Sequence, residues 1–476
     1  MKLTKRVFMA RVTLMLLLVL TAGTGRGQIL RTSYFMEGTQ YRMQLNPALA
    51  PDRGFVNIPI AGNINAATRS DALTVDDVVD IFRNGGDDDY YTTDEFNAKL
   101  NERNRATANM STDLIHAGWW HGKGFMSFNV SVKSDGYVSV PKELFSFMRD
   151  MKGLNSNDYT DYRRDLSDEE LNVNVYTEIG AGYTRRINDH VSIGGRIKCL
   201  LGQGNLNLRV DHAVAESHLT GVDPDINWSE AGILEVIKAR GTGSIDITAT
   251  LESSAEGLEY TTNERGYIER ARFEAKNMGV AGIGAAADVG FACRVGDVVE
   301  LSAALTDLGF INWYKGCTQI AHSNTSDLTF DSKSPGDISR FSGIMGQGEA
   351  INLHLLRLVP DEQSGASSRR TTLASTLAVG LNYHVMRDRF SLGVLYTDRF
   401  SHVVDGSELT FSANWHPRSL LDLSLSYSPI LCGGSSIGFA VKAGPLFVGT
   451  DYMYLGSKTK CCNALIGLSI PLGQRQ

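Results

Sequence analysis

The sequence lacks any long apolar run after its first 20 residues. Its 476 residues are 42% hydrophobic, but beyond Leu20 no stretch approaches the roughly 20 consecutive apolar residues that a membrane-spanning helix requires. A helical membrane protein is therefore excluded. A membrane β-barrel is not excluded, because only alternate residues of its strands face lipid and its average hydrophobicity stays low.

Cysteine and proline are also scarce, at 6 and 11 residues. The cysteines show neither the CxxC spacing nor the histidine partners of a zinc site, so no metal site is predicted. A disulfide that joins Cys317 to Cys432 or Cys461 is a hypothesis only. The 48 glycines outnumber the prolines, which suits a β-rich chain with many tight turns.

The sequence has no strong excess of charge and no catalytic signature. The net charge is −7 without a basic cluster, so no nucleic-acid partner is predicted. No HExxH pattern and no serine nucleophile motif occur, so neither an enzyme nor a cofactor is expected. Residues 282–287 match the dinucleotide fingerprint G-x-G-x-x-A, but they alternate as a strand does, which disfavours a nucleotide site.

The N-terminus has the order and length of a secretory signal peptide. Basic residues precede the apolar run Val12–Leu20, and small residues follow it. We predict that residues 1–27 are removed before Gln28. The run is too short to favour a membrane-spanning helix.

From Thr371 to Leu472 the chain reads as at least six short strands with strict alternation. Leu377, Val379, Leu381 and Tyr383 share one parity, whereas Gly380, Asn382 and His384 share the other. Successive side chains of a strand point to opposite faces, so each strand separates an apolar from a polar environment. A soluble antiparallel sandwich produces the same pattern.

The connections favour an outer-membrane barrel over a sandwich. Short turns at residues 386–388, 417–419 and 444–445 fall at one end of the predicted strands, and long links at residues 67–112, 134–170 and 307–370 fall at the other. Outer-membrane barrels have short periplasmic turns and long extracellular loops. A direct count of strands gives about sixteen, with residues 202–276 poorly assigned. Short helices are expected in the loops, the clearest of them at Pro141–Met151.

The segment before the first predicted strand is irregular and apolar. Pro47 and Pro51 interrupt regular structure, whereas Tyr41 and Leu45 make the segment too apolar for a disordered tail. We interpret residues 28–54 as a plug inside the lumen of a barrel formed by residues 55–476. The first strand is predicted at about Phe55–Ile64.

Several polar residues fall on the inward parity of predicted strands. The clearest hairpin joins residues 171–186 to residues 190–201 and places Glu178 opposite Lys198, with Arg196 one step along. Inward glycines on this hairpin leave space for a plug, and its charges indicate water or polar groups in the lumen. The predicted polar residues of the lumen are Glu178, Arg196, Lys198, Asp288 and Asn382.

Three short motifs together resemble a known group of barrels. Asn46-Pro47-Ala48 is similar to the hatch motif of FadL-type long-chain fatty-acid transporters, and residues 178–198 resemble a hairpin common in that superfamily. Residues 307–310 (DLGF) resemble a segment of its PorV-like, secretion-associated members. Residues 33–51 are most like an uncharacterised Bacteroidota outer-membrane family.

This resemblance implies an all-β fold, a closed antiparallel transmembrane barrel of about fourteen strands (range about twelve to sixteen). It implies a plug that includes Asn46, Pro47 and Ala48, and a location in the outer membrane of a Gram-negative bacterium. The sequence departs from many outer-membrane barrels in one respect, because residues 472–476 end without an aromatic residue.

Two functions are compatible with such a barrel. The first is a channel or transporter for a hydrophobic or amphipathic small molecule, gated by the plug, with outer-membrane lipid around it. The second is a docking or secretion-associated factor that binds a protein partner through its extracellular loops. The sequence alone does not separate them.

Overall fold

The computed structural model describes the following residues: 30–74, 76–77, 80, 93–153, 161–220, 240–273, 279–296, 298–334, 353–361, 368–385, 389–400, 406–418, 421–431, 434–452 and 460–474. The predicted signal peptide and Cys432 lie outside these ranges. Cys317 and Cys461 are free thiols, so the hypothesis of a disulfide between these two is wrong.

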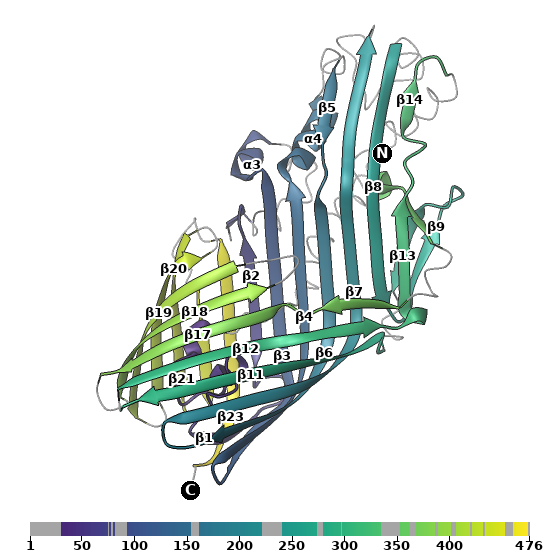
Figure 1. Cartoon of the computed structure of the whole chain (residues 1–476). Helices are drawn as coiled ribbons and strands as arrows, with labels where there is room; N and C mark the ends of the chain where they lie inside the picture. The colour runs from purple at the N-terminus through teal and green to yellow at the C-terminus, as the bar shows by residue number, and fades with distance from the viewer. Residues whose placement is uncertain are drawn as a thin grey trace.

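The described strands form a closed antiparallel barrel with fourteen positions in its ring (Figure 1). The ring closes where β1 pairs with β23, with Val56 opposite Ile470. The strands in ring order are β1 (Arg53–Asn57) with β2 (Ile64–Ser70), β3 (Arg103–His121), β4 (Gly124–Pro141), β6 (Glu169–Arg186), β7 (Val191–Thr220), β11 (Gly282–Val295), β12 (Val299–Trp313), β17 (Ser375–His384), β18 (Phe390–Phe400), β19 (Gly406–Arg418), β20 (Leu421–Leu431), β21 (Gly434–Ala443), β22 (Leu446–Thr450) and β23 (Cys461–Gln474). The predicted closed barrel of about fourteen strands is confirmed.

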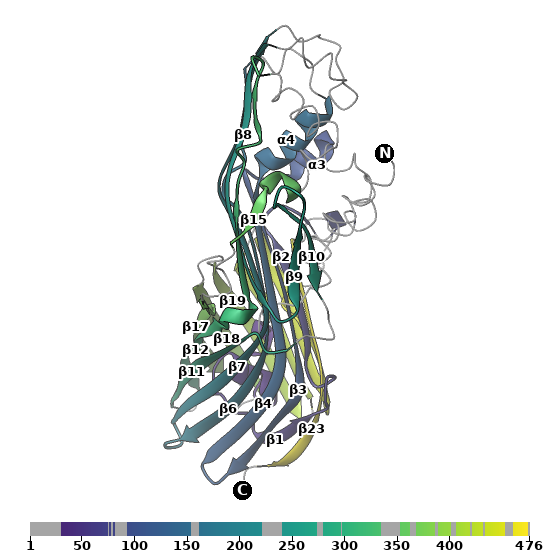
Figure 2. The ribbon, with the colours of Figure 1, turned by 90° about the vertical axis from the view of Figure 1, so that its right-hand side faces the viewer.

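The direct count of sixteen strands is wrong because part of the sheet stands above the ring. The lower half of β7 pairs with β11, whereas its upper half pairs with β8 (Arg240–Ala255). β8 in turn pairs with β13 (Thr318–Ser323) and β14 (Thr329–Asp331). These strands, with β5 (Tyr162–Asp165) and β15 (Leu358–Pro360), form an extension that rises from one side of the barrel (Figures 1 and 2).

The extension has its own apolar core. Helix α4 (Lys142–Gly153), which confirms the predicted loop helix, and α3 (Asp94–Lys99) lie against one face of the sheet (Figure 2). The hairpin of β9 (Leu258–Thr262) and β10 (Ile268–Phe273) forms a separate two-stranded sheet. The buried core residues of the extension are Phe147, Tyr162, Leu166, Leu171, Leu208, Val210, Ala213, Ala215, Ile245, Ile247, Ala249, Leu251, Ala321, Leu328, Leu355, Leu356 and Leu358.

The three ranges predicted as long loops contain more strand than expected. β3 begins at Arg103, β4 continues to Pro141, and β12 continues to Trp313 before β16 (Arg369–Thr372) pairs with its upper half. The residues there are mostly polar, so they lack the apolar alternation that marks a strand in lipid. Backbone pairing nevertheless continues beyond the part of the barrel whose outer surface is apolar.

The barrel wall has one apolar and one polar face, as the alternation predicts. The outer surface carries exposed large side chains, among them Ile197, Val289, Phe291, Leu381, Leu392, Phe411, Leu425, Phe439, Val448, Ile466 and Ile470. The inner surface carries buried polar side chains, among them Asn382, Ser391, Thr410, Asn414, Ser424, Ser426 and Asn463. This is the surface of a barrel that spans a bilayer. In the part of the chain that is described, no helix is long and apolar enough to cross a membrane.

The first strand is interrupted, which the sequence did not predict. Instead of one strand at residues 55–64, β1 ends at Asn57 and β2 begins at Ile64, although both pair with β3 and with β23. Pro59 lies in the gap and cannot donate a backbone hydrogen bond. Ile60 has φ of 66°, a left-handed conformation that is strained for a β-branched residue.

Residues 30–52 lie inside the barrel and fill its lower half. They contain two short 3-10 helices, Arg31–Ser33 and Gln40–Gln44. Their apolar side chains pack in separate groups: Tyr34, Phe35, Leu45, Ala48 and Leu49 against Ala292, Ala378 and Leu395; Leu30, Met36 and Tyr41 against Ala440, Phe447 and Leu465; and Met43 against Phe55 and Phe125. We call residues 30–52 the plug.

Inward glycines of the wall make room for the plug, as expected from the hairpin. A Cβ atom added at Gly194 would overlap the carbonyl group of Pro47, and one at Gly290 would overlap the side chain of Asn46. At these two glycines the wall has no side chain, so the plug packs directly against the backbone of the wall.

We expect Gly194→Ala to displace the plug and Gly195→Ala to leave it in place. At Gly195 the nearest atom to an added Cβ is the Asp288 carbonyl oxygen at 3.6 Å, an ordinary contact. Overpacking costs about 1–3 kcal/mol. In Gly194→Ala the added methyl group overlaps Pro47, so this cost weakens the contact between the wall and the plug. Hydrogen exchange of the plug peptide in both variants measures the effect, and equal protection in the two would contradict the prediction.

Candidate functional site

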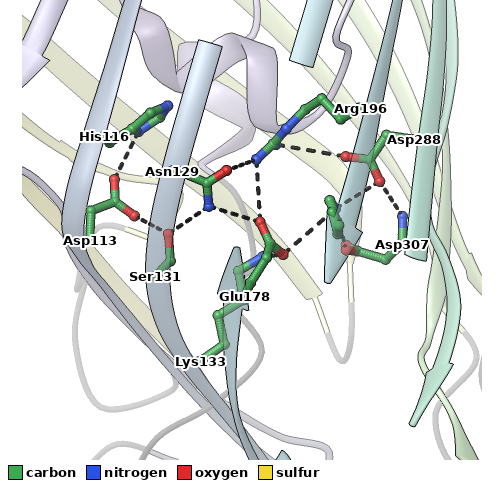
Figure 3. A network of polar contacts seen from close by, with 10 residues as sticks. Asp113, His116, Asn129, Ser131, Lys133, Glu178, Arg196, Asp288 and Asp307 are labelled. Atoms are coloured by element: carbon green, nitrogen blue, oxygen red, sulfur yellow. Dashed lines mark hydrogen bonds and ion pairs between the residues drawn. The ribbon is translucent and has the colours of Figure 1, made fainter. Parts of the chain in front are cut away.

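Charged and polar side chains meet on the inner wall above the plug (Figure 3). They come from six consecutive strands of the ring, β3, β4, β6, β7, β11 and β12, because each strand turns its inward parity to the same region. The members are Asp113, His116, Asn129, Ser131, Lys133, Glu178, Arg196, Lys198, Asp288 and Asp307. We call them the wall network.

Glu178 is the centre of the wall network. Its carboxylate accepts from Lys133 Nζ at 2.6 Å, from Asn129 Nδ2 at 3.0 Å and from Arg196 Nη2 at 3.2 Å, and Lys198 Nζ lies 3.8 Å away. The side chain of Glu178 is 1% exposed. A carboxylate this deeply buried stays ionised only when several charged donors surround it.

The predicted partners of Glu178 are correct, but the predicted register is not. Glu178 lies opposite Leu200, and Lys198 lies opposite Gly180. The turn is longer than the predicted Asn188-Asp189, because the last pair of the hairpin is Arg186 with Ser192. The long side chains of Arg196 and Lys198 bridge the two-residue offset diagonally.

Asp288 and Asp307 complete the wall network at β11 and β12. Lys198 Nζ lies 2.7 Å from both carboxylates, and the backbone N–H of Asp307 donates to Asp288 Oδ1. Strict alternation would point Asp307 outward, since Thr306 faces inward. Asp307 instead has φ of 59°, and the register of β11 against β12 shifts between Ala287 and Val289. This bulge turns Asp307 into the lumen.

A second bulge brings Asp113 and His116 together. The register of β3 against β4 shifts between Asp113 and Ile115, so two residues three apart face the same side. His116 Nδ1 lies 2.9 Å from Asp113 Oδ2, and Ser131 Oγ donates to Asp113 Oδ1 at 2.7 Å. Asn129 then links Ser131 to Glu178.

Sequence reasoning identified four members of the wall network (Glu178, Arg196, Lys198 and Asp288) and missed the other six. The sequence predicts a hairpin at residues 114–133 without assigning a site to it, and His116, Asn129, Ser131 and Lys133 lie in that hairpin. Asp113 precedes it, and Asp307 enters only through the DLGF motif. The inward parity of Lys133, which pairs across the sheet with Tyr176, was a usable signal. The two bulges left no mark in the alternation.

The predicted plug motif lies against the same strands, below the wall network. Asn46 Nδ2 donates to Tyr34 Oη at 3.1 Å, and Asn46 Oδ1 accepts the backbone N–H of Ala48 at 2.9 Å. Thr184 Oγ1 donates to the carbonyl of Pro47, and Ser192 Oγ donates to the carbonyl of Ala48. Asn46-Pro47-Ala48 thus forms a tight turn that is hydrogen-bonded to β6 and β7.

The other predicted residues of the plug and lumen occupy separate places. Tyr41 Oη donates to the carbonyl of Gly62 at 2.6 Å, so it reaches the break in the first strand. Leu45 packs with Tyr34 in an apolar group. Asn382 is fully buried beside His384 and does not join the wall network.

At its N-terminal end the plug is held by charge. Arg31 forms an ion pair with Glu408, and its guanidinium donates to Tyr452 Oη at 2.7 Å. Asp451 accepts the backbone N–H groups of Arg31 and Thr32, at 3.1 and 2.8 Å.

The plug separates two cavities of the lumen. The upper cavity, of 140 Å³, lies between the top of the plug and the wall network, and Arg31, Gln44 and Leu45 are its plug residues. The lower cavity, of 570 Å³, lies at the short-turn end, where Glu37, Arg42, residues 48–50 and Asp52 of the plug line it.

Glu37, Glu300 and His384 form the one group in the described residues whose ligand atoms lie close enough for a metal ion, within 4.8 Å of one another. Two arginines also reach these carboxylates, Arg42 at 3.4 Å from Glu300 and Arg294 at 3.6 Å from Glu37. The guanidinium groups already balance the carboxylates, so this group acts as an ion-paired contact between plug and wall.

We expect Glu178→Gln to destabilise the protein by about 3–5 kcal/mol, because it leaves buried Arg196 and half-buried Lys133 short of a counter-charge. Adding Lys133→Met should restore part of the loss, since the two side chains are in contact. Glu216→Gln, in the exposed pair with Arg163, is the control and should cost less than about 1 kcal/mol. Urea unfolding in detergent measures all three, and equal losses for Glu178→Gln and Glu216→Gln would contradict the argument.

We expect docking of the plug to weaken as the pH rises. Burial, with Glu300 nearby, raises the pKa of Glu37 to about 7 from 4.5, although Arg42 opposes the shift. A raised pKa means that the docked plug binds the proton more tightly than the released plug, so this contribution is complete below about pH 4.5 and lost through pH 7. Hydrogen exchange of the plug, corrected for intrinsic rates, should show less protection at pH 8 than at pH 5. Glu37→Gln should remove that difference, and an unchanged difference would refute the role of Glu37.

Comparisons with solved structures give barrels of similar architecture at low identity. The TodX deltaS2S3 mutant monoaromatic hydrocarbon channel is 9% identical, covers 92% of this chain and 95% of its own, and has a TM-score of 0.41. The Pseudomonas putida toluene transporter TodX is 8% identical over 94% and 93% of the two chains, with a TM-score of 0.37. A Pseudomonas aeruginosa FadL homologue is 11% identical over 95% of both chains, also at 0.37. These similarities concern the fold alone.

No curated protein matches the sequence. One family model does, and its match extends over residues 47–451, from the second residue of the Asn46-Pro47-Ala48 turn to Asp451 beneath Arg31. That range contains the whole wall network and all but the last strand of the ring. The chain belongs to the family of unknown function DUF5723.

Proposed function

We propose that the protein is a channel in the outer membrane of a Gram-negative bacterium, that it admits an amphipathic small molecule, and that the plug gates it. The observation that carries the proposal is the plug itself, which fills the lumen between two cavities. A barrel that served only as a membrane anchor would need neither cavity.

The contacts of the plug suit a movable element. They are divided among small apolar groups, the hydrogen bonds of the Asn46-Pro47-Ala48 turn and the ion pairs of Arg31 and Arg42. Residues 30–52 contain no cysteine, so no disulfide fixes the plug to the wall. Separate weak contacts can be exchanged for contacts with water or ligand one group at a time.

The break in the first strand supports a sideways path for an apolar tail. Ile58 and Ile60 are exposed on the outer surface, at 38% and 59%. On the inner side of the same break, Tyr41 of the plug donates to the Gly62 carbonyl, and Gln40 donates to Asn57. Movement of the plug would release both contacts and expose the gap to the lumen.

A docking factor is the second candidate. The extension supports it, because a paired sheet with its own apolar core rises from one side of the ring (Figure 2) and offers a rigid surface to a protein partner. Docking requires no movement of the plug, so a test of the plug separates the two functions.

Deletion of residues 34–51 should open the lumen. In proteoliposomes we expect the flux of an amphipathic fluorescent probe to rise about tenfold or more over the intact chain. The matched control removes residues 258–273, the β9–β10 hairpin, which pairs only with itself among the described strands. Equal flux through the intact chain and the plug deletion would reject gating and leave docking as the better explanation.

A further inference from the structure

Neutral amide and hydroxyl side chains form one part of the lining of the upper cavity, beside its charged residues. Asn63, Asn65, Asn109 and Ser111 lie side by side on β2, β3 and the residue before β2, since Asn65 pairs across the sheet with Ser111. We call these four residues the amide row. Further neutral polar side chains around the cavity are Gln44, Thr107, Asn129, Ser131, Asn172, Thr376 and Thr397.

One acceptor of the amide row has no partner. Asn63 is 2% exposed and lines the cavity. Its side chain donates a hydrogen bond to Asp113, which leaves its amide oxygen without a hydrogen bond among the described residues. An unsatisfied buried acceptor costs about 1–3 kcal/mol, and a donor on a bound molecule would recover that cost.

The charges around the cavity balance one another. Six of the lining residues are cations and five are carboxylates: Arg31, Arg69, Lys133, Arg196, Lys198 and Arg399 against Asp113, Asp135, Glu178, Asp307 and Glu408. Asp288, which lies 2.7 Å from Lys198 Nζ, is the sixth carboxylate. Arg31 of the plug and Arg69 of β2 both contact Glu408 of β19. A ligand with a net charge would enter without a counter-ion and would lose its hydration. A neutral ligand meets no such cost.

The size of the cavity and its few apolar residues narrow the ligand further. A volume of 140 Å³ holds on the order of five waters at about 30 Å³ each. A head group with several hydroxyls can replace such waters one for one. Leu45, Leu373, Tyr137 and Tyr176 supply apolar contact beside the polar groups.

We infer that the upper cavity binds the polar part of the transported amphiphile, and that this part is neutral and hydroxyl-rich, as a single sugar ring is. The Asn63 amide oxygen accepts a hydrogen bond from one ligand hydroxyl, and the Ser111 hydroxyl forms a hydrogen bond with a second one. Tyr137 and Tyr176 contact the apolar face of the sugar ring. The inference rests on the proposed transport function and adds the chemical class of the ligand to it.

The binding also reaches the plug. Asn57 Nδ2 donates to Asp113 Oδ2 at 3.2 Å and to the Gly62 carbonyl at 3.0 Å, and Gln40 of the plug donates to Asn57 Oδ1. Asn63 donates to the same Asp113 carboxylate. A ligand hydroxyl bound to Asn63 is therefore linked to Gln40 of the plug through Asp113 and Asn57.

Three probes with the same octyl chain test the head group. They are octyl glucoside, nonanoate and octyltrimethylammonium, each below its micelle concentration, with the full mature chain in lipid nanodiscs and calorimetry as the measurement. We expect octyl glucoside to bind at least about tenfold more tightly than either charged probe, and free glucose to compete with it. Equal affinity for all three probes, or tighter binding of a charged one, would overturn the inference.

Two variants and one control locate the binding. Asn63→Leu should weaken octyl glucoside by roughly three- to tenfold, the value of one hydrogen bond, and Ser111→Ala should weaken it in the same direction with little risk to folding. The control is Asn382→Leu, because Asn382 is equally buried, also has an amide oxygen without a partner among the described residues, and does not line the cavity. Altered mobility of unheated protein on a gel identifies any variant that fails to fold. Unchanged binding in folded Ser111→Ala and Asn63→Leu would refute the assignment.

Failure of this inference differs from failure of the proposed function. If the plug deletion raises the flux of all three octyl probes alike, the channel stands and the head-group preference falls. If no probe crosses in either form, the channel itself falls, and binding of octyl glucoside would then show a site without transport.

Discussion

A wall that faces lipid must satisfy every backbone N–H and C=O group within the protein, and the rest of this structure depends on that constraint. Among the described residues, each strand of the ring pairs with both of its neighbours from β1 to β23, and the first position of the ring is interrupted between Asn57 and Ile64. There the plug and neighbouring strands replace the missing ladder: Tyr41 and Asn57 donate to the Gly62 carbonyl, and Leu468 donates to Ala61. The weakest point of the wall is thus the point where the plug contributes to it.

The same constraint explains why the lumen is so polar and yet so ordered. Side chains that face inward are removed from bulk water by the plug, so each charge needs a partner nearby. The wall network supplies partners in both directions, because Glu178 contacts three cations and Lys198 contacts three carboxylates. Such a network is rigid when complete, which keeps the upper cavity in one shape.

The fold was predictable from sequence, and the site was predictable only in part. Alternation at Leu381, Asn382 and Tyr383 assigns both faces of a strand, because lipid and lumen differ so much. A bulge adds one residue to a strand, and every residue after it then points to the face opposite to the one that alternation predicts. Asp307 and His116 turn inward in this way, without any signal in the sequence pattern. The extension was missed for another reason, since a sheet above the membrane has water on one face and needs no apolar outer parity.

Under the proposed gating, the distribution of contacts along the plug favours movement of its middle part. Arg31 and Thr32 are bound to Asp451 through buried charged hydrogen bonds, and the Asn46-Pro47-Ala48 turn is bound to β6 and β7. Between these two anchors the plug combines apolar contacts, which have no fixed direction, with separate polar contacts of Glu37, Gln40, Tyr41 and Arg42. Movement of residues 34–45 between fixed ends would release Tyr41 from Gly62 and connect the upper and lower cavities, while the ring itself stays closed.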